Sequence, residues 1–178
     1  VGALVALAAI SRVHQVDKPW SERLMFDTVP GLWLLGQASR YATRQVVKAT
    51  LSKEAALTRE QLAEQLEYVM SDDAQREFVL TMVRTMSFRP PRRAGRDNDK
   101  VQFAGIKDLA LERVVAPVLL VHGEVDTEVS PNDSYSASAR LPNAELVMVP
   151  QGGHACAFVA QDAETVQERI RQFLRCHC

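Results

Sequence analysis

The stretch VVAPVLLVHGEVDTEVSP, residues 114–131, joins a continuous apolar run to a polar loop that carries Asp126. Runs of Val and Leu that end abruptly at Gly are typical of strands buried on both faces of a parallel sheet. Two further runs have this character, VGALVALAAI at residues 1–10 and AELVMVP at residues 144–150. The sequence therefore predicts a sheet of about three parallel strands.

Helices are predicted between and after these strands. Pro131 fits the first turn of a short helix that extends to Arg140. In the last part of the chain, Val166, Ile170 and Phe173 recur at the spacing of one helical face. The order strand, helix, strand, helix predicts an α/β architecture with right-handed crossovers.

The middle of the chain, residues 17–104, is predicted to be a helical insertion between two strands of one sheet. Pro30 suits the first turn of one helix, and Thr58 followed by Gln61 is a capping box that opens another. The segment FRPPRRAGRDNDK at residues 88–100 is expected to be a polar loop, because two prolines and a glycine interrupt it. Residues 1–16 and 105–178 then form the α/β core.

Composition excludes several classes of protein. The 178 residues carry 21 Lys and Arg against 22 Asp and Glu, so no positive field favours nucleic acid or an anionic membrane surface. The longest apolar stretch, residues 3–10, has only about half the length of a membrane-spanning helix, and it lacks the basic flank and the small-residue cleavage site of a signal peptide. The three cysteines are an odd number and occur late, which favours a reducing, cytoplasmic location.

Asp126 and His154 are the candidate catalytic residues. Each follows the carboxyl end of a predicted parallel strand, where open α/β sheets build their sites. A carboxylate that accepts one imidazole N–H leaves the other ring nitrogen free to act as a base. Asp126 as a plain turn residue and His154 as a structural histidine are the alternatives. Cys156 is interpreted as a packing residue rather than a nucleophile.

The two loops, HGEVDTEVSP and VPQGGHA, resemble the C-terminal half of the α/β-hydrolase superfamily, with its HGxxDxxxP and GGH segments. The resemblance implies that Asp126 is the acid of a catalytic triad, that His154 is its general base, and that the helical insertion is a cap. It also implies hydrolysis of a small apolar ester or acyl substrate, without a metal or organic cofactor.

The sequence departs from the family in one respect. Family members carry a serine nucleophile on a GxSxG elbow before the strand that opens this chain, and no serine here has that pattern. We therefore expect a C-terminal portion that lacks its nucleophile and is inactive alone. An aspartate nucleophile, as in dehalogenases and epoxide hydrolases, remains an alternative to serine.

A non-catalytic module is the second hypothesis. The opening strand is expected to have a free edge on the side where the rest of the sheet would lie, and free apolar edges pair readily with other chains. We expect this edge to bind a partner chain or a second copy. A module of this kind would bind a ligand or a protein without turning it over.

Overall fold

The computed structural model describes residues 2–12, 20, 24, 28–85 and 90–177. Strands β1 (Leu4–Leu7), β2 (Val118–Gly123) and β3 (Ala144–Val149) form one parallel sheet in the order β1-β2-β3. Leu4 pairs with Val118, which in turn pairs with Ala144 on the other side. The prediction of an α/β fold with three parallel strands is confirmed.

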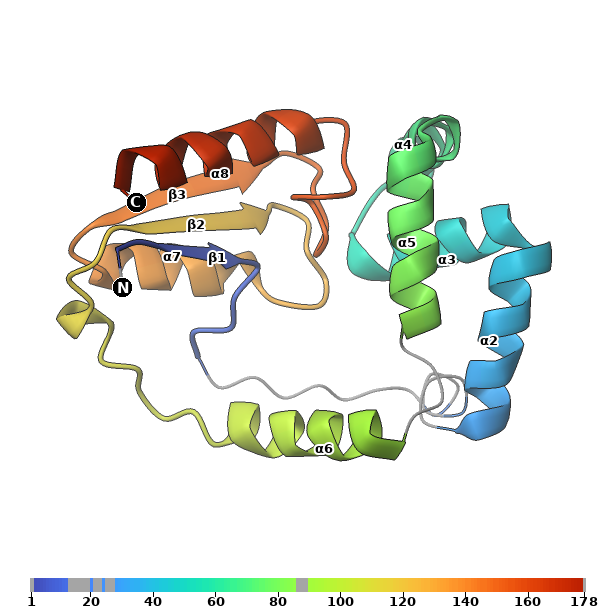
Figure 1. Cartoon of the computed structure of the whole chain (residues 1–178), viewed down its shortest axis with the longest axis horizontal. Helices are drawn as coiled ribbons and strands as arrows, with labels where there is room; N and C mark the ends of the chain where they lie inside the picture. The colour runs from blue at the N-terminus through green and yellow to red at the C-terminus, as the bar shows by residue number, and fades with distance from the viewer. Residues whose placement is uncertain (1, 13–19, 21–23, 25–27, 86–89, 178) are drawn as a thin grey trace.

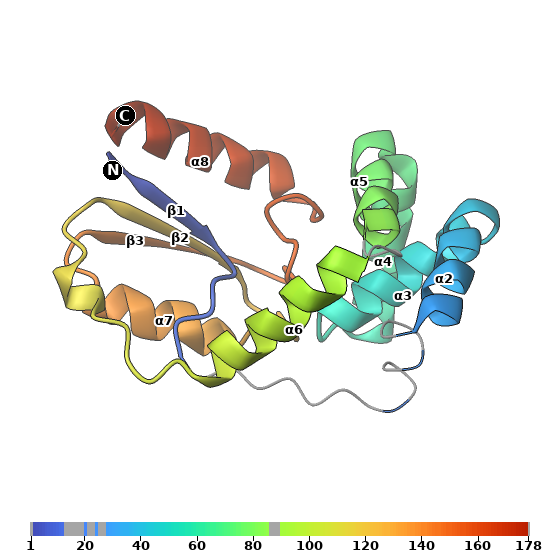
Figure 2. The ribbon, with the colours of Figure 1, turned by 60° about the horizontal axis from the view of Figure 1, so that its bottom comes forward.

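Helices cover both faces of the sheet (Figures 1 and 2). Helix α7 (Pro131–Arg140) lies against one face and α8 (Ala163–His177) against the other. Successive strand residues point to opposite faces, so Leu119 clusters with Phe173 of α8 while Leu120 clusters with Ala137 of α7. All six residues of β2 are buried as a result.

Strand β1 is shorter and more exposed than the sequence suggests. The expected strand covered residues 1–10, but β1 spans only Leu4–Leu7, and these two leucines are 46% and 37% exposed. Within the described residues β1 pairs with β2 on one side only. The apolar run is therefore only partly buried here.

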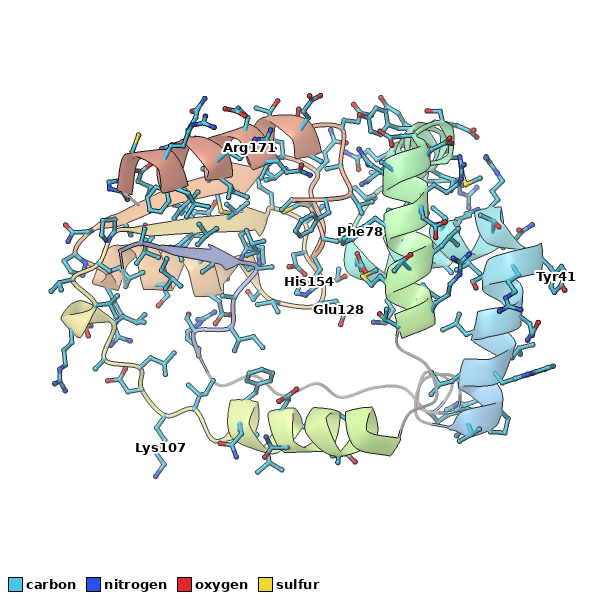
Figure 3. The ribbon with its side chains drawn as sticks, in the orientation of Figure 1. Tyr41, Phe78, Lys107, Glu128, His154 and Arg171 are labelled. Atoms are coloured by element: carbon cyan, nitrogen blue, oxygen red, sulfur yellow. The ribbon has the colours of Figure 1, made fainter. Side chains whose placement is uncertain are left out.

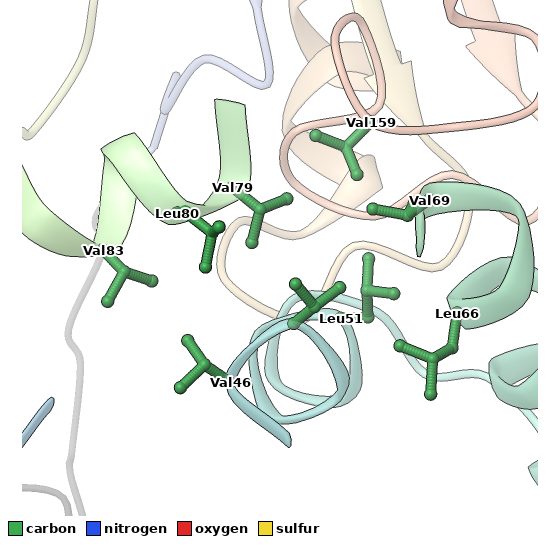
Figure 4. Packing of buried hydrophobic residues seen from close by; sticks show 9 residues of the cluster. Val46, Leu51, Leu66, Val69, Val79, Leu80, Val83 and Val159 are labelled. Atoms are coloured by element: carbon green, nitrogen blue, oxygen red, sulfur yellow. The ribbon is translucent and has the colours of Figure 1, made fainter. Parts of the chain in front are cut away.

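Four helices form a separate layer beside the carboxyl ends of the strands (Figure 1). They are α2 (Val29–Tyr41), α3 (Thr43–Glu54), α4 (Arg59–Ser71) and α5 (Asp73–Thr85), and together they are called the four-helix insertion below. The predicted capping box is confirmed, since the side chains of Thr58 and Gln61 each hydrogen-bond to the backbone N–H of the other residue. Figure 4 shows the core of this layer, formed by Val46, Val47, Leu51, Leu66, Val69, Val79, Leu80, Val83 and Val159.

The prediction of a loop at residues 88–100 is wrong for the residues described. Helix α6 runs from Pro90 to Ala104, and residues 88 and 89 lie outside the described part. Both prolines fall in its first turn, where a missing N–H interrupts no helical hydrogen bond. Gly95 is exposed and sits in open space, so the helix tolerates it at a cost of about 1 kcal/mol relative to alanine. Proline breaks a helix in its interior but not in its first turn, which is why the loop prediction failed.

The short 3-10 turn η1 (Leu111–Arg113) leads from this region into β2. The boundary predicted at residues 16 and 17 falls outside the described residues. In the part of the chain that the structure describes, no helix combines the length and the apolar character needed to cross a membrane.

Candidate active site

The Asp126 loop, residues 123–131, begins at the carboxyl end of β2 and ends where α7 starts. One carboxylate oxygen of Asp126, Oδ1, accepts the backbone N–H groups of Glu128 at 2.8 Å and Val129 at 3.0 Å. Such a turn fixes the carboxylate relative to its own backbone. The other oxygen, Oδ2, remains available for partners outside the loop.

The His154 loop, residues 150–162, follows β3 and precedes α8. It reverses direction at Gln151, whose φ of 53° lies in the left-handed region. Its backbone is bonded to the Asp126 loop, because the N–H of Val125 donates to the carbonyl of Gly152 at 3.1 Å. One backbone hydrogen bond therefore joins the two loops directly.

Glycine is required where the loops meet. A Cβ on Gly123 would lie 2.1 Å from the carbonyl oxygen of Gly152, far inside any tolerated contact. The glycine of the HG pair thus permits the close approach of the Asp126 loop to the His154 loop.

The structure brings Asp126 and His154 together. Nδ1 of His154 lies 3.0 Å from Oδ2 of Asp126, which is a hydrogen bond that joins residues 28 positions apart. The Asp126 side chain is fully buried, whereas that of His154 is 40% exposed. In Figure 3 His154 lies in the space between the strand ends and α5. The buried carboxylate thus orients a partly exposed imidazole.

The electrostatics of the pair favour a charged imidazole. The hydrogen bond to Asp126 raises the pKa of His154 above its ordinary value, and burial offsets this only in part. Burial alone would raise the pKa of Asp126, but hydrogen bonds from His122, His154 and the Val129 N–H outweigh it and hold that pKa below its usual range. The pair therefore stabilises a proton taken up by His154.

His122 is a site residue to which the sequence analysis assigned no role. It is the fifth residue of β2 and is fully buried. Its Nε2 lies 3.1 Å from the carbonyl oxygen of Val129 and 3.2 Å from Oδ2 of Asp126, and its Nδ1 lies 2.7 Å from the hydroxyl of Ser134. A histidine inside an apolar strand is the sequence signal that points to such a buried polar contact.

Glu54 is a second residue that the sequence analysis missed. It is the last residue of α3, in the four-helix insertion. Burial raises the pKa of Glu54 to about 7, although attraction between its carboxylate and His154 acts to lower that pKa. The charge of Glu54 in turn contributes to the raised pKa of His154. Nothing in its local sequence distinguishes it from an ordinary polar residue at a helix end.

A cavity of about 220 Å³ opens beside His154. Apolar side chains from β1, β2, α5 and the His154 loop line it, among them Leu7, Val121, Phe78 and Phe158. The rings of Phe78 and Phe158 stack with centroids 4.9 Å apart. Cys156 also lines the cavity, but it is buried and its pKa is raised to about 11, so its thiol is not ionised near neutral pH. It lies in a turn and packs as expected.

Comparisons with known proteins agree with this architecture. A family model described as TAP-like protein, an α/β-hydrolase family, matches residues 99–176. An α/β-hydrolase fold protein from Nakamurella multipartita is 34% identical and superimposes with a TM-score of 0.93 over 98% of this chain. The chain belongs to the α/β-hydrolase superfamily.

Other hydrolases share the fold at lower identity. An esterase from Rhodococcus sp. ECU1013 is 20% identical, with a TM-score of 0.54 over 99% of this chain and 57% of its own. The meta-cleavage product hydrolase of Pseudomonas fluorescens IP01 is 14% identical, with a TM-score of 0.50 over 96% of this chain and 54% of its own. The chain spans 61% of the Nakamurella protein. No curated protein matches it significantly.

Proposed function

We propose that Asp126 and His154 are the acid and the general base of a hydrolytic triad that cleaves carboxylic esters or related acyl substrates. The observation that carries this proposal is the 3.0 Å hydrogen bond between a buried carboxylate and a half-exposed imidazole at neighbouring strand ends. Among the described residues, no serine is hydrogen-bonded to His154. The proposal places the serine nucleophile on a GxSxG elbow, a pattern that these 178 residues do not contain.

In the proposed mechanism, Asp126 accepts the Nδ1–H of His154, which leaves Nε2 free to take the proton of the serine hydroxyl. The serine oxygen then bonds to the acyl carbon, and the imidazolium returns its proton to the leaving alcohol. A water molecule, deprotonated by the same histidine, hydrolyses the acyl-enzyme and regenerates serine. No step requires a metal or an organic cofactor.

The cavity beside His154 supports a small apolar substrate. At about 220 Å³ it is smaller than the pockets of roughly 300–1,000 Å³ that hold drug-sized ligands. Its lining of aliphatic and aromatic side chains suits a short acyl chain. We assign the enzyme to the cytoplasm because its cysteines are few and odd in number.

The test uses the polypeptide translated from the continuous reading frame that contains these residues. We expect a GxSxG segment before residue 1 and hydrolysis of p-nitrophenyl acetate that falls by about 10³ to 10⁴ in Asp126→Asn or His154→Ala. His177→Ala is the matched control, since His177 is exposed in the last turn of α8. Parental rates in the Asp126 and His154 variants would refute the proposal.

A non-catalytic module is the second candidate, and the exposed edge of β1 favours it. Leu4 and Leu7 present apolar surface on β1, a strand that has a partner on one side only within the described residues. Pairing with a second copy through β1 would give a dimer that light scattering detects. A charge in Leu4→Lys would then shift the chain towards monomer. A monomer at all concentrations would argue against this candidate.

A further inference from the structure

One backbone carbonyl of the four-helix insertion binds both site loops. The carbonyl oxygen of Glu54 accepts the N–H of Thr127 and the N–H of His154, each at 3.2 Å. The last carbonyls of a helix have no partner within the helix. At the end of α3 the loops that carry Asp126 and His154 supply those partners.

The Asp126 loop has further contacts with the same segment, residues 53–56. The N–H of Ala56 donates to the carbonyl of Val125 at 2.8 Å, and Ala55 forms an antiparallel bridge with Asp126 itself. The hydroxyl of Thr127 donates to the carbonyl of Lys53. The ammonium group of Lys53 also forms an ion pair with Glu128. These contacts fix the backbone on both sides of the carboxylate.

The four-helix insertion also contacts the part of the His154 loop that follows His154. Two buried side-chain amides donate to it, Gln65 to the carbonyl of Val159 at 3.4 Å and Gln75 to that of Ala160 at 3.1 Å. The side chain of Val159 is 4% exposed and belongs to the core of the insertion (Figure 4). The loop is thus packed into the helical layer rather than only resting on it.

Gly153 allows this contact. A Cβ at residue 153 would lie 2.8 Å from the carbonyl oxygen of Glu54 and 2.9 Å from Cβ of Ala55. Both neighbours belong to backbone or to a side chain with no freedom to rotate away, so an added methyl group would push the segment and the loop apart.

We propose that residues 53–56 are a positioning segment that aligns Asp126 with His154, so that the pair is assembled only while the four-helix insertion is seated on the strand ends. The catalytic meaning of this alignment rests on the proposed function. The segment touches neither substrate nor nucleophile in this account. It acts through the two loops, by holding one N–H of each on a single carbonyl oxygen.

The electrostatics of the contact reinforce its effect. The carbonyl end of a helix carries a partial negative charge, and the end of α3 directs it at the His154 backbone. The acidic groups that raise the pKa of His154 are Asp126, Glu54 and Glu128. Loss of the contact moves the His154 loop away from Glu54 and loosens the loop that carries Asp126 and Glu128, so proton binding by His154 reports whether the segment is in place.

The first experiment compares Gly153→Ala with Gly95→Ala in the 178-residue chain. The control adds the same methyl group at an exposed position with no atom within 4 Å. Nuclear magnetic resonance follows the titration of His154, assigned with a His154→Gln variant among four histidines. Hydrogen exchange follows the amides of residues 127 and 154.

We expect Gly153→Ala to lower the pKa of His154 towards the ordinary value of about 6.5. Both amides should exchange about tenfold faster in that variant, and neither readout should change in Gly95→Ala. A general loss of stability would not move the pKa of His154 in the folded state. A folded Gly153→Ala chain with an unchanged His154 titration would overturn the proposal.

A milder pair of variants decides the question if Gly153→Ala does not fold. Thr127→Val removes the hydroxyl bonded to Lys53, and Thr50→Val removes a hydroxyl bonded within α3 to Val46 at 3.0 Å. A lower His154 pKa in Thr127→Val than in Thr50→Val supports the proposal, and equal values overturn it. Neither readout requires turnover, so failure here is distinguishable from failure of the proposed hydrolytic function.

Discussion

The hydroxyl of Ser134 lies 2.7 Å from Nδ1 of His122, and both side chains are buried at the carboxyl end of β2. On its other side the ring faces two acceptors, the Val129 carbonyl and the Asp126 carboxylate. This environment assigns the ring hydrogen to Nε2, with the Ser134 hydroxyl donating to Nδ1. His122 therefore tethers the carboxylate to the start of α7.

Replacing His122 by Phe keeps a planar aromatic ring at this position but removes all of these hydrogen bonds. We expect the free energy of unfolding to fall by about 1–3 kcal/mol, because the Ser134 hydroxyl and the Val129 carbonyl lose their partner in a buried site. Urea unfolding measures the change. Ser52→Ala at an exposed position should stay within about 0.5 kcal/mol of the parent. An equally small effect of His122→Phe would contradict the tether.

Asp126→Asn should change how stability depends on pH. The folded-state pKa of Asp126 is lowered, so its contribution is present above the unfolded-state value of about 4 and is lost as pH falls through the folded-state pKa. The His154 pKa is raised, so its contribution is present below about 6.5 and is lost as pH rises through the folded-state value.

We expect Asp126→Asn to lower the unfolding free energy by about 1–3 kcal/mol near pH 6, where both groups contribute. The two curves should converge as pH falls below about 4. Urea unfolding of parent and variant between pH 2 and pH 9 checks this. A difference that is constant across that range would show that the ionised pair contributes nothing.

Glu54→Gln should stabilise the chain at alkaline pH. Burial raises the pKa of Glu54 to about 7, so the folded state favours the protonated form and the parent loses stability as pH rises towards and through that value. A glutamine cannot ionise. The variant should be more stable by about 1–3 kcal/mol at pH 8 and unchanged at pH 4.

Glu60→Gln, at an exposed position in α4, is the control for Glu54→Gln. It should change stability by less than about 0.5 kcal/mol at either pH. If Glu54→Gln is no more stable than the parent at pH 8, the carboxyl group of Glu54 is solvated rather than buried.

Gly123→Ala should be severely destabilising. The new Cβ would lie 2.1 Å from the Gly152 carbonyl, so the two site loops would have to separate. We expect a loss of at least about 3 kcal/mol in thermal or urea unfolding. Gly95→Ala, in open space on α6, should instead be neutral or stabilising by up to about 1 kcal/mol. Similar stabilities for these two alanine variants would show that the loops do not meet as described.

The strands and the two loops could be predicted from the sequence because local residue patterns specify them. An apolar run that ends at His122 and Gly123 specifies a strand and its end, and Gly152 with Gly153 marks a turn before His154. Because the strands are parallel, their ends share one edge of the sheet. The proximity of Asp126 and His154 follows from that arrangement.

What the sequence could not reveal depends on contacts between distant segments. Glu54 and Lys53 look like ordinary polar residues at the end of a helix, and only the fold brings them to residues 126–128 and 154. His122 is visible as a polar residue in an apolar strand, but its partners are known only from the fold. The loop prediction at α6 was wrong because Pro90 and Pro91 lie in the first turn of the helix, where proline is tolerated, and not in its interior.

The most direct test of the account is hydrolysis of p-nitrophenyl acetate by the 178-residue chain beside its His154→Ala variant. The proposed function predicts that neither exceeds the uncatalysed rate, because its serine nucleophile belongs to a GxSxG segment that these residues lack. Turnover by the parent chain that His154→Ala abolishes would place a nucleophile within these residues and contradict the account.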